Sequence, residues 1–202
     1  MRDEVVATLA VAADAFLVRR ASVDSTSVIA GYPWFADWGR DSMIALSGLT
    51  LTTGRFAEAR EILSTFLRYR RRGLVPNNFH DDGSGAGYNT VDGPLWLVVA
   101  FERYVDATGD LDFLRAHLGE LREVLTDLAG GTDYGVGLHG SGLLRAGSAG
   151  VQLTWMDVRI HEWVVTPRHG RPVEIAALWL TALGAHDRLA ARLGEAAVFA
   201  DL

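Results

Sequence analysis

Stretches in which apolar residues recur every three or four positions alternate along this chain with polar, glycine-rich connectors. Such spacing places the apolar side chains on one face of a helix. The pattern predicts seven helices, over residues 4–20, 42–53, 55–72, 93–108, 111–129, 172–184 and 187–199. The chain is therefore expected to be all-α.

The predicted helices are of two kinds. Residues 93–108 contain the run LWLVVAF, which is apolar nearly all round and typical of a helix buried on several sides. Residues 55–72 carry apolar side chains on one face and charges on the other. Apolar helices begin near 42, 93 and 172, and amphipathic helices near 55, 111 and 187. This alternation indicates inner and outer helices, with the loops before the inner helices at one rim.

The connector over residues 130–171 is far longer than an ordinary link between helices. Connectors of this length in compact domains are usually functional loops or contain short strands. Leu153–Met156 and Glu162–Thr166 could form a short β pair. The segment is thus the expected active-site loop.

Composition and charge narrow the class of protein. The chain has 49% hydrophobic and 22% charged residues, as ordinary globular proteins do. A net charge of −6 argues against a nucleic-acid partner. The absence of cysteine excludes disulfides, thiol catalysis and cysteine-based zinc sites. No apolar run reaches the length of a membrane span, and the acidic N-terminus is unlike a signal peptide, so a cytoplasmic protein without membrane contact is expected.

Cofactor chemistry has no support in the sequence. Dinucleotide, P-loop and serine-hydrolase motifs do not occur. The spacing of His80, Asp81 and Asp82 matches no standard metal site, and a solvated loop is favoured there. Neither a cofactor nor a metal ion is therefore expected.

Four of the six tryptophans lie in polar connectors beside acidic residues. Trp34 and Trp38 belong to WFADWGRDS, and Trp155 and Trp163 belong to TWMDVRIHEW. An aromatic ring packs well on the C–H face of a sugar, while a carboxyl group bonds its hydroxyls or protonates its glycosidic oxygen. The pattern therefore favours a carbohydrate site.

Asp157 is the candidate general acid. Its sequence neighbours Trp155, Met156, Val158 and Ile160 could form an apolar collar, and such a collar favours the protonated form of a carboxyl group. The alternative is that Asp157 is a turn or cap residue beside a strand.

Other candidates have equally plausible structural roles. Arg40 and Asp41 adjoin Trp38 and could grip neighbouring hydroxyls, or Asp41 could cap the next helix. Asp92 stands at a good helix-cap position. Glu174 falls in the first turn of a helix, where acids are favourable in any case.

Three strings in the chain resemble the C-terminal domain of glycogen debranching enzymes, the amylo-α-1,6-glucosidase type. They are GYPWFADWGRDSMIALSGL, GYNTVDGPLW and QLTWMDVRIHEWVVTPRHGRPVEIAALW. The likeness runs from about residue 5 to the end. Ala176 stands where the family often has asparagine, and Val91-Asp92-Gly93 replaces a frequent Ala-Asp-Ala.

The resemblance implies an (α/α)6 toroid of the glucoamylase-like type and inverting hydrolysis of α-1,6 branch linkages in glycogen or limit dextrin. It implies that Asp157 is the general acid and that Arg40 and Asp41 hold the terminal glucose. Further pocket residues that it implies are Trp38, Asp92, Trp155, Arg168 and Glu174.

The seven predicted helices are fewer than the twelve of a full toroid. The chain, residues 1–202, is therefore expected to be a partial glucosidase domain, inactive alone, with the catalytic base beyond residue 202. Uncovered inner helices such as LWLVVAF would favour self-association. Three alternatives stay open: a glucan-binding module without chemistry, a toroidal glycosidase for another sugar, and a helical interaction scaffold.

Overall fold

The computed structural model describes residues 2–32 and 34–200. The helices are α1 (Arg2–Asp14), α2 (Gly39–Leu46), α3 (Phe56–Arg68), α4 (Asp92–Thr108), α5 (Leu111–Gly130) and α6 (Val173–Arg192), with a π-helical turn η1 (Ser47–Leu51) and a 3₁₀ turn η2 (Asp133–Gly135). The strands are β1 (Leu17–Arg20), β2 (Ser25–Gly31), β3 (Phe35–Asp37), β4 (Asn78–Phe79), β5 (Ala86–Gly87), β6 (Gly137–Leu138), β7 (Leu144–Arg145), β8 (Arg159–Ile160) and β9 (Trp163–Val164). The chain is thus mostly helical, but it is not all-α.

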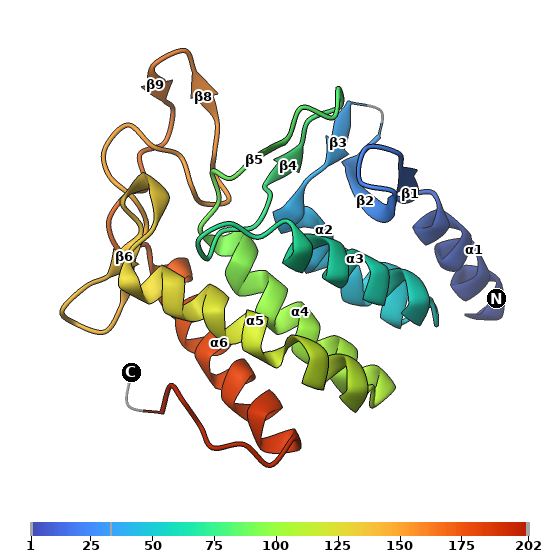
Figure 1. Cartoon of the computed structure of the whole chain (residues 1–202). Helices are drawn as coiled ribbons and strands as arrows, with labels where there is room; N and C mark the ends of the chain where they lie inside the picture. Colours follow the sequence, from blue (N-terminus) through green and yellow to red (C-terminus); the bar gives the residue numbers. More distant parts are fainter. Residues whose placement is uncertain (1, 33, 201–202) are drawn as a thin grey trace.

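Helix α4 lies at the centre of a layer in which α2 and α6 flank it (Figure 1). Helices α3 and α5 pack on this layer as a second one. Helices of the two layers therefore alternate from α2 to α6, in agreement with the hydrophobic pattern over residues 42–184. The N-terminal ends of α2, α4 and α6 lie at the same end of the layer as the small hairpins.

The expectation that the run LWLVVAF is poorly covered is wrong. Leu95, Leu97, Val98 and Phe101 are fully buried, because α4 has neighbours on several sides. Large apolar side chains are instead exposed on α1 and α6, namely Val5, Val6, Leu9, Val11, Val173 and Leu180. None of the helices in the described part of the chain is long and apolar enough to cross a membrane.

The first predicted helix and the last two differ from the observed elements. The first ends at Asp14, and β1, β2 and β3 follow as an antiparallel sheet that the sequence analysis missed. Pairing with β2 places Val18 opposite Ser27, so contacts distant in sequence override the helical spacing. The last two predicted helices are one, α6, because buried Leu183, Ala185 and Leu189 continue a single apolar face.

The long connector contains two hairpins, β6–β7 and β8–β9. The predicted pairing of Leu153–Met156 with Glu162–Thr166 is wrong, because Trp163 pairs with Ile160 across a shorter turn. The carbonyl of Leu153 instead accepts a hydrogen bond of 2.8 Å from the backbone N–H of Val91. This bond ties the connector to the start of α4.

Candidate functional site

A pocket of about 410 Å³ opens at the N-terminal end of α2. Its walls come from the β2–β3 hairpin, from the first turn of α2 and from the connector before β8. The lining residues are Ala30, Phe35, Trp38, Arg40, Asp41, Trp155 and Asp157. Segments more than a hundred residues apart in the sequence thus meet around one hollow.

Gly39 fixes the start of α2 and therefore the place of Arg40 and Asp41. Its N–H donates to the carbonyl of Asn77 over 2.7 Å. A Cβ atom at residue 39 would lie only 2.1 Å from the carbonyl oxygen of Pro76, so no other residue fits without a backbone shift. The helix begins before Asp41, and no side chain caps it. The alternative in which Asp41 caps α2 is therefore wrong.

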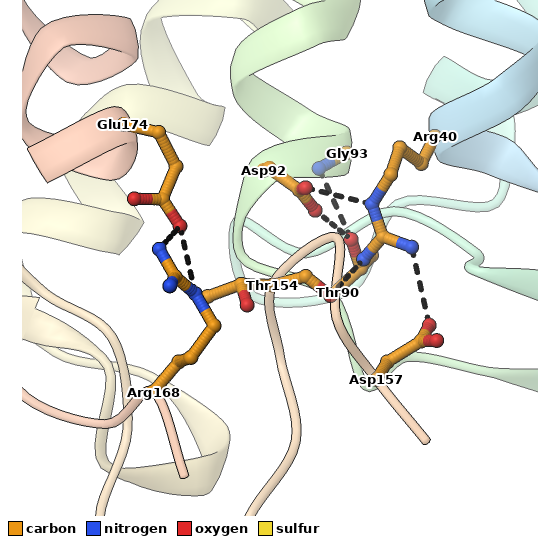
Figure 2. A network of polar contacts seen from close by, with 8 residues as sticks. All are labelled: Arg40, Thr90, Asp92, Gly93, Thr154, Asp157, Arg168 and Glu174. Carbon is orange, nitrogen blue, oxygen red and sulfur yellow. Dashed lines mark hydrogen bonds and ion pairs between the residues drawn. The ribbon is translucent and has the colours of Figure 1, made fainter. Parts of the chain in front are cut away.

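The Arg40 guanidinium joins three parts of the chain (Figure 2). Nε donates to Asp92 Oδ2 over 2.7 Å, and Nη1 donates to Asp157 Oδ2 over 3.1 Å. Nη2 donates to the backbone carbonyl of Thr154 over 2.8 Å. Burial opposes the charge of Arg40, but the two carboxylates outweigh it and raise the pKa of the guanidinium. Arg40 is therefore a fixed cation at the base of the pocket.

Asp92 lies behind Arg40 and outside the pocket lining. Its side chain is buried, with one oxygen bonded to Arg40 and the other accepting a 2.7 Å hydrogen bond from the Thr90 hydroxyl. The expectation that Asp92 caps α4 is wrong, because the backbone N–H of Gly93 donates to Thr90 Oγ1 instead, over 3.1 Å. Both oxygens of the Asp92 carboxylate thus serve to hold Arg40 and Thr90.

Asp41 presents its carboxylate to the pocket. Burial raises the pKa of this group above its ordinary value, and the nearby Arg40 offsets the rise only in part. Within residues 2–32 and 34–200, no other side chain hydrogen-bonds or pairs with it. The Asp41 oxygens are therefore open to an incoming hydroxyl.

Asp157 meets Arg40 in an ion pair, with its own side chain 23% exposed. The apolar collar expected from its sequence neighbours does not enclose it, because Val158 and Ile160 are about half exposed. Trp155 and Arg40 are instead its neighbours in the pocket lining. The environment of Asp157 therefore depends on residues far away in the sequence.

Arg168 and Glu174 form a pair apart from the Arg40 cluster (Figure 2). Arg168 donates through Nε and Nη2 to Glu174 Oε1. The guanidinium carbon of Arg168 is 5.8 Å from the ring centroid of Trp155. The Arg168 guanidinium thus lies over the Trp155 ring, and neither Arg168 nor Glu174 lines the pocket.

Sequence reasoning missed two pocket residues, Phe35 and Ala30. Phe35 stands in the same aromatic string as Trp34 and Trp38, and this was a usable signal. Ala30 carries none, because its place depends on the pairing of β2 with β3, in which Gly31 lies opposite Phe35.

The three-residue group His80, Asp81 and Asp82 has local roles. Asp81 pairs with Arg20, and Asp82 accepts from the backbone N–H of Ser84. Across residues 2–32 and 34–200, no group of three or more histidine and acidic side chains could hold a metal ion.

Comparison with known proteins identifies relatives of this chain. The family model for amylo-alpha-1,6-glucosidase matches residues 11–200. The glycogen debranching enzyme of Saccharomyces cerevisiae (strain ATCC 204508 / S288c) is 39% identical over 84 residues, which cover 39% of this chain. The same match covers only 5% of the yeast protein, so it spans a small part of that relative.

Proposed function

Because this chain belongs to the amylo-alpha-1,6-glucosidase family, we propose that its pocket binds the glucose unit at an α-1,6 branch of a glycogen-like glucan. The proposed reaction is hydrolysis of that branch linkage with inversion. One observation carries the proposal: two tryptophans, one arginine and two carboxylates line a single hollow. Flat apolar faces together with directional hydrogen-bonding groups suit a sugar ring.

The pocket groups divide into two roles. Arg40 and Asp41 bind hydroxyls of the glucose unit, since both are charged residues of the pocket lining. Trp38 and Trp155 cover the faces of the sugar. Asp92 acts through Arg40 and is a positioning residue, because both of its oxygens are already engaged. Arg168 and Glu174 hold Trp155 in the same indirect way.

Asp157 is proposed as the general acid, which must carry a proton when the substrate is in place. A carboxylate in an ion pair with arginine is the ionised form. We therefore infer that sugar hydroxyls replace Asp157 as partners of Arg40 Nη1 during binding. Asp157, freed from that ion pair, then takes up a proton from solvent and donates it to the glycosidic oxygen as the bond to the glucose unit breaks.

An inverting reaction needs a second carboxylate about 6.5–9.5 Å from the acid, so that a water molecule fits between. Asp41 and Asp157 are the carboxylates of the described pocket lining, and Asp41 is assigned to hydroxyl binding. No base is assigned among the described residues. The 202-residue chain alone is accordingly proposed to bind branched glucan and to hydrolyse it little.

The alternation of inner and outer helices supports a finer proposal for the fold. Helices α2, α4 and α6 would be inner members of an (α/α)6 toroid, and α3 and α5 outer members. The first turns of these three helices carry Arg40, Asp92 and Glu174, at the end of the layer where a toroid of this kind would hold its substrate.

A glucan-binding module without chemistry is the second candidate. The Arg40–Asp157 ion pair favours it, since an ionised Asp157 can hold a hydroxyl as Asp41 does. The two candidates differ in what they require of Asp157. Catalysis needs a carboxyl group that can donate a proton, whereas binding is served by an amide too.

Substitution of Asp157 by asparagine tests the proposal. In an active enzyme that contains this sequence, Asp157→Asn is expected to lower glucose release from limit dextrin at least about a hundredfold, because proton transfer by a positioned group contributes that much. Binding of the dextrin should persist. Asp112→Asn, a change at an exposed residue of α5, is the matched control and should leave release unchanged. If Asp157→Asn releases glucose as fast as the unchanged enzyme, Asp157 is not the general acid.

A further inference from the structure

Two tryptophans in the aromatic and acidic strings have no part in the pocket. Trp34 is 85% exposed and Trp163 is 61% exposed. Neither ring lies against another ring or over a cation within the part of the chain that the structure describes. Large aromatic surface left in water is typical of a recognition site. These rings therefore need an explanation beyond core packing.

Both rings stand on hairpins that rise from the pocket walls. Trp34 is in the β2–β3 turn, and its neighbour Phe35 lines the pocket. Trp163 opens β9 in the hairpin that begins two residues after Asp157, on the other wall. In Figure 1 the two hairpins lie at the end of the helix layer where α2, α4 and α6 begin, on opposite sides of the view. The β2–β3 turn and the β8–β9 hairpin, each continuous with a segment that lines the pocket, are here called the rim.

The β8–β9 hairpin is held in shape by its own bonds. Arg159 pairs with Glu162 over 2.6 Å, and Arg159 Nε donates to the carbonyl of His161 over 2.8 Å. The N–H of Val165 donates to the carbonyl of Val158 over 3.1 Å. Trp163 is therefore presented on a fixed backbone, so its binding would cost little conformational entropy.

The turn that carries Trp34 is anchored as well. The Tyr32 hydroxyl donates to the carbonyl of Ala15, and its ring meets Phe16 edge-on at 5.8 Å. These contacts fasten the turn to the segment after α1. Trp34 remains outside them and open to a ligand.

We propose that Trp34 and Trp163 are outer platforms for the α-glucan chain that continues away from the glucose unit in the pocket. The inference rests on the proposed function and adds the polymer as the ligand of the rim. A branched glucan extends beyond any single-glucose pocket, so residues continuous with the pocket walls must meet it. The charges beside Trp163 are paired with each other, which suits a neutral polymer better than a charged partner.

Binding measured separately with a polymer and with a disaccharide distinguishes the role of the two rim tryptophans from that of the pocket. The chain, the double variant Trp34→Ala/Trp163→Ala and Trp38→Ala are each titrated with limit dextrin in affinity electrophoresis and with isomaltose in calorimetry. The double variant is expected to bind dextrin about tenfold more weakly and isomaltose as the wild type does. Trp38→Ala is expected to weaken both.

Phe56→Ala is the matched control, since Phe56 is an exposed aromatic residue at the start of α3, which follows the far end of α2. Its binding of both ligands should be unchanged. If the double variant binds dextrin as tightly as the wild type does, the inference is overturned and the proposed function is left intact. Equal losses for dextrin and isomaltose would also overturn it, because the rings would then belong to the pocket. A wild-type chain that binds neither ligand contradicts the proposed function itself.

Discussion

At the scale of single residues, the candidate site depends on one buried cation. Arg40 holds Asp92, Asp157 and the carbonyl of Thr154 at once, so three segments take their positions from it. A buried charge of this kind is tolerated only when its partners are present. The same residue that is proposed to bind the sugar therefore also organises the site.

Removal of Asp92 tests this organisation. Asp92→Ala is expected to lower the free energy of unfolding by about 3–5 kcal/mol, because it leaves Arg40 with part of its buried charge uncompensated. Urea titration followed by circular dichroism gives the value. Asp106→Ala, a change to an exposed residue on the same helix that pairs with Arg192, is the control and should cost less than about 1 kcal/mol. Similar losses for the two variants would show that Asp92 has no special part in the network.

Asp41 affects stability in the opposite direction to Asp92, because burial makes its negative charge unfavourable in the folded chain. Its folded pKa is raised above the ordinary 3.8, so its stabilising contribution is present below pH 3.8 and lost as pH rises through the folded pKa. Asp41→Asn should therefore raise the melting temperature at pH 7. The gain should shrink as the pH is lowered toward 4. A variant that melts below the wild type at neutral pH contradicts this account of Asp41.

At the scale of elements, the small hairpins and helix starts place the chemistry. The first turn of α2 carries Arg40 and Asp41, and the start of α4 carries Asp92. The connector before β8 supplies Trp155 and Asp157. The helices themselves supply the rigid layer on which these segments are fixed.

The C-terminal half of α6 contains a buried titratable group. His186 is fully buried and its ring meets Phe199 at 4.9 Å. Burial lowers the pKa of His186 from its ordinary 6.5, although Asp187 opposes this shift. The neutral form is thus favoured in the folded chain.

Protonation of His186 should loosen this end of the molecule. Because the folded pKa of His186 lies below the unfolded value of 6.5, its contribution to stability is fully present above pH 6.5. That contribution is lost as the pH falls from 6.5 through the folded pKa. Urea unfolding between pH 7.5 and 5.5 should show the decline, and His186→Phe should reduce it. An equal decline in stability for the wild type and His186→Phe would show that other titratable groups cause it.

The elements also show what sequence patterns can and cannot predict. Periodicity found α3, α4 and α5 with small errors at the ends, because each buries one continuous apolar face. It missed the β1–β2–β3 sheet, since residues 17–20 satisfy a helical pattern locally and become a strand only through pairing with β2. Short hairpins such as β8–β9 likewise depend on turns and distant contacts.

The same limit applies to the site residues. The aromatic and acidic strings pointed to Trp38, Arg40, Asp41, Trp155 and Asp157, which the fold brings into one pocket. The separate roles of these five residues could not be predicted from the strings. Asp92 has the sequence position of a helix cap, yet Thr90 Oγ1 accepts the Gly93 N–H and Asp92 pairs with Arg40.

At the scale of the whole molecule, the helix layers bury the central α4 and leave apolar side chains at the margins. The exposed residues on α1 and α6, such as Val11 and Val173, are the surfaces that self-association would use. Self-association through LWLVVAF is not expected, because that run is covered. The pocket lies at the end of the layer where α2 begins.

The position of a bound disaccharide tests the central claim most directly. A crystal structure of the chain with isomaltose is predicted to place one glucose ring between Trp38 and Trp155, with its hydroxyls about 3 Å from Arg40 and Asp41. The bridging oxygen should lie within about 3.2 Å of an Asp157 oxygen. Isomaltose bound outside this pocket, or bound in it with the bridging oxygen turned away from Asp157, would contradict the account.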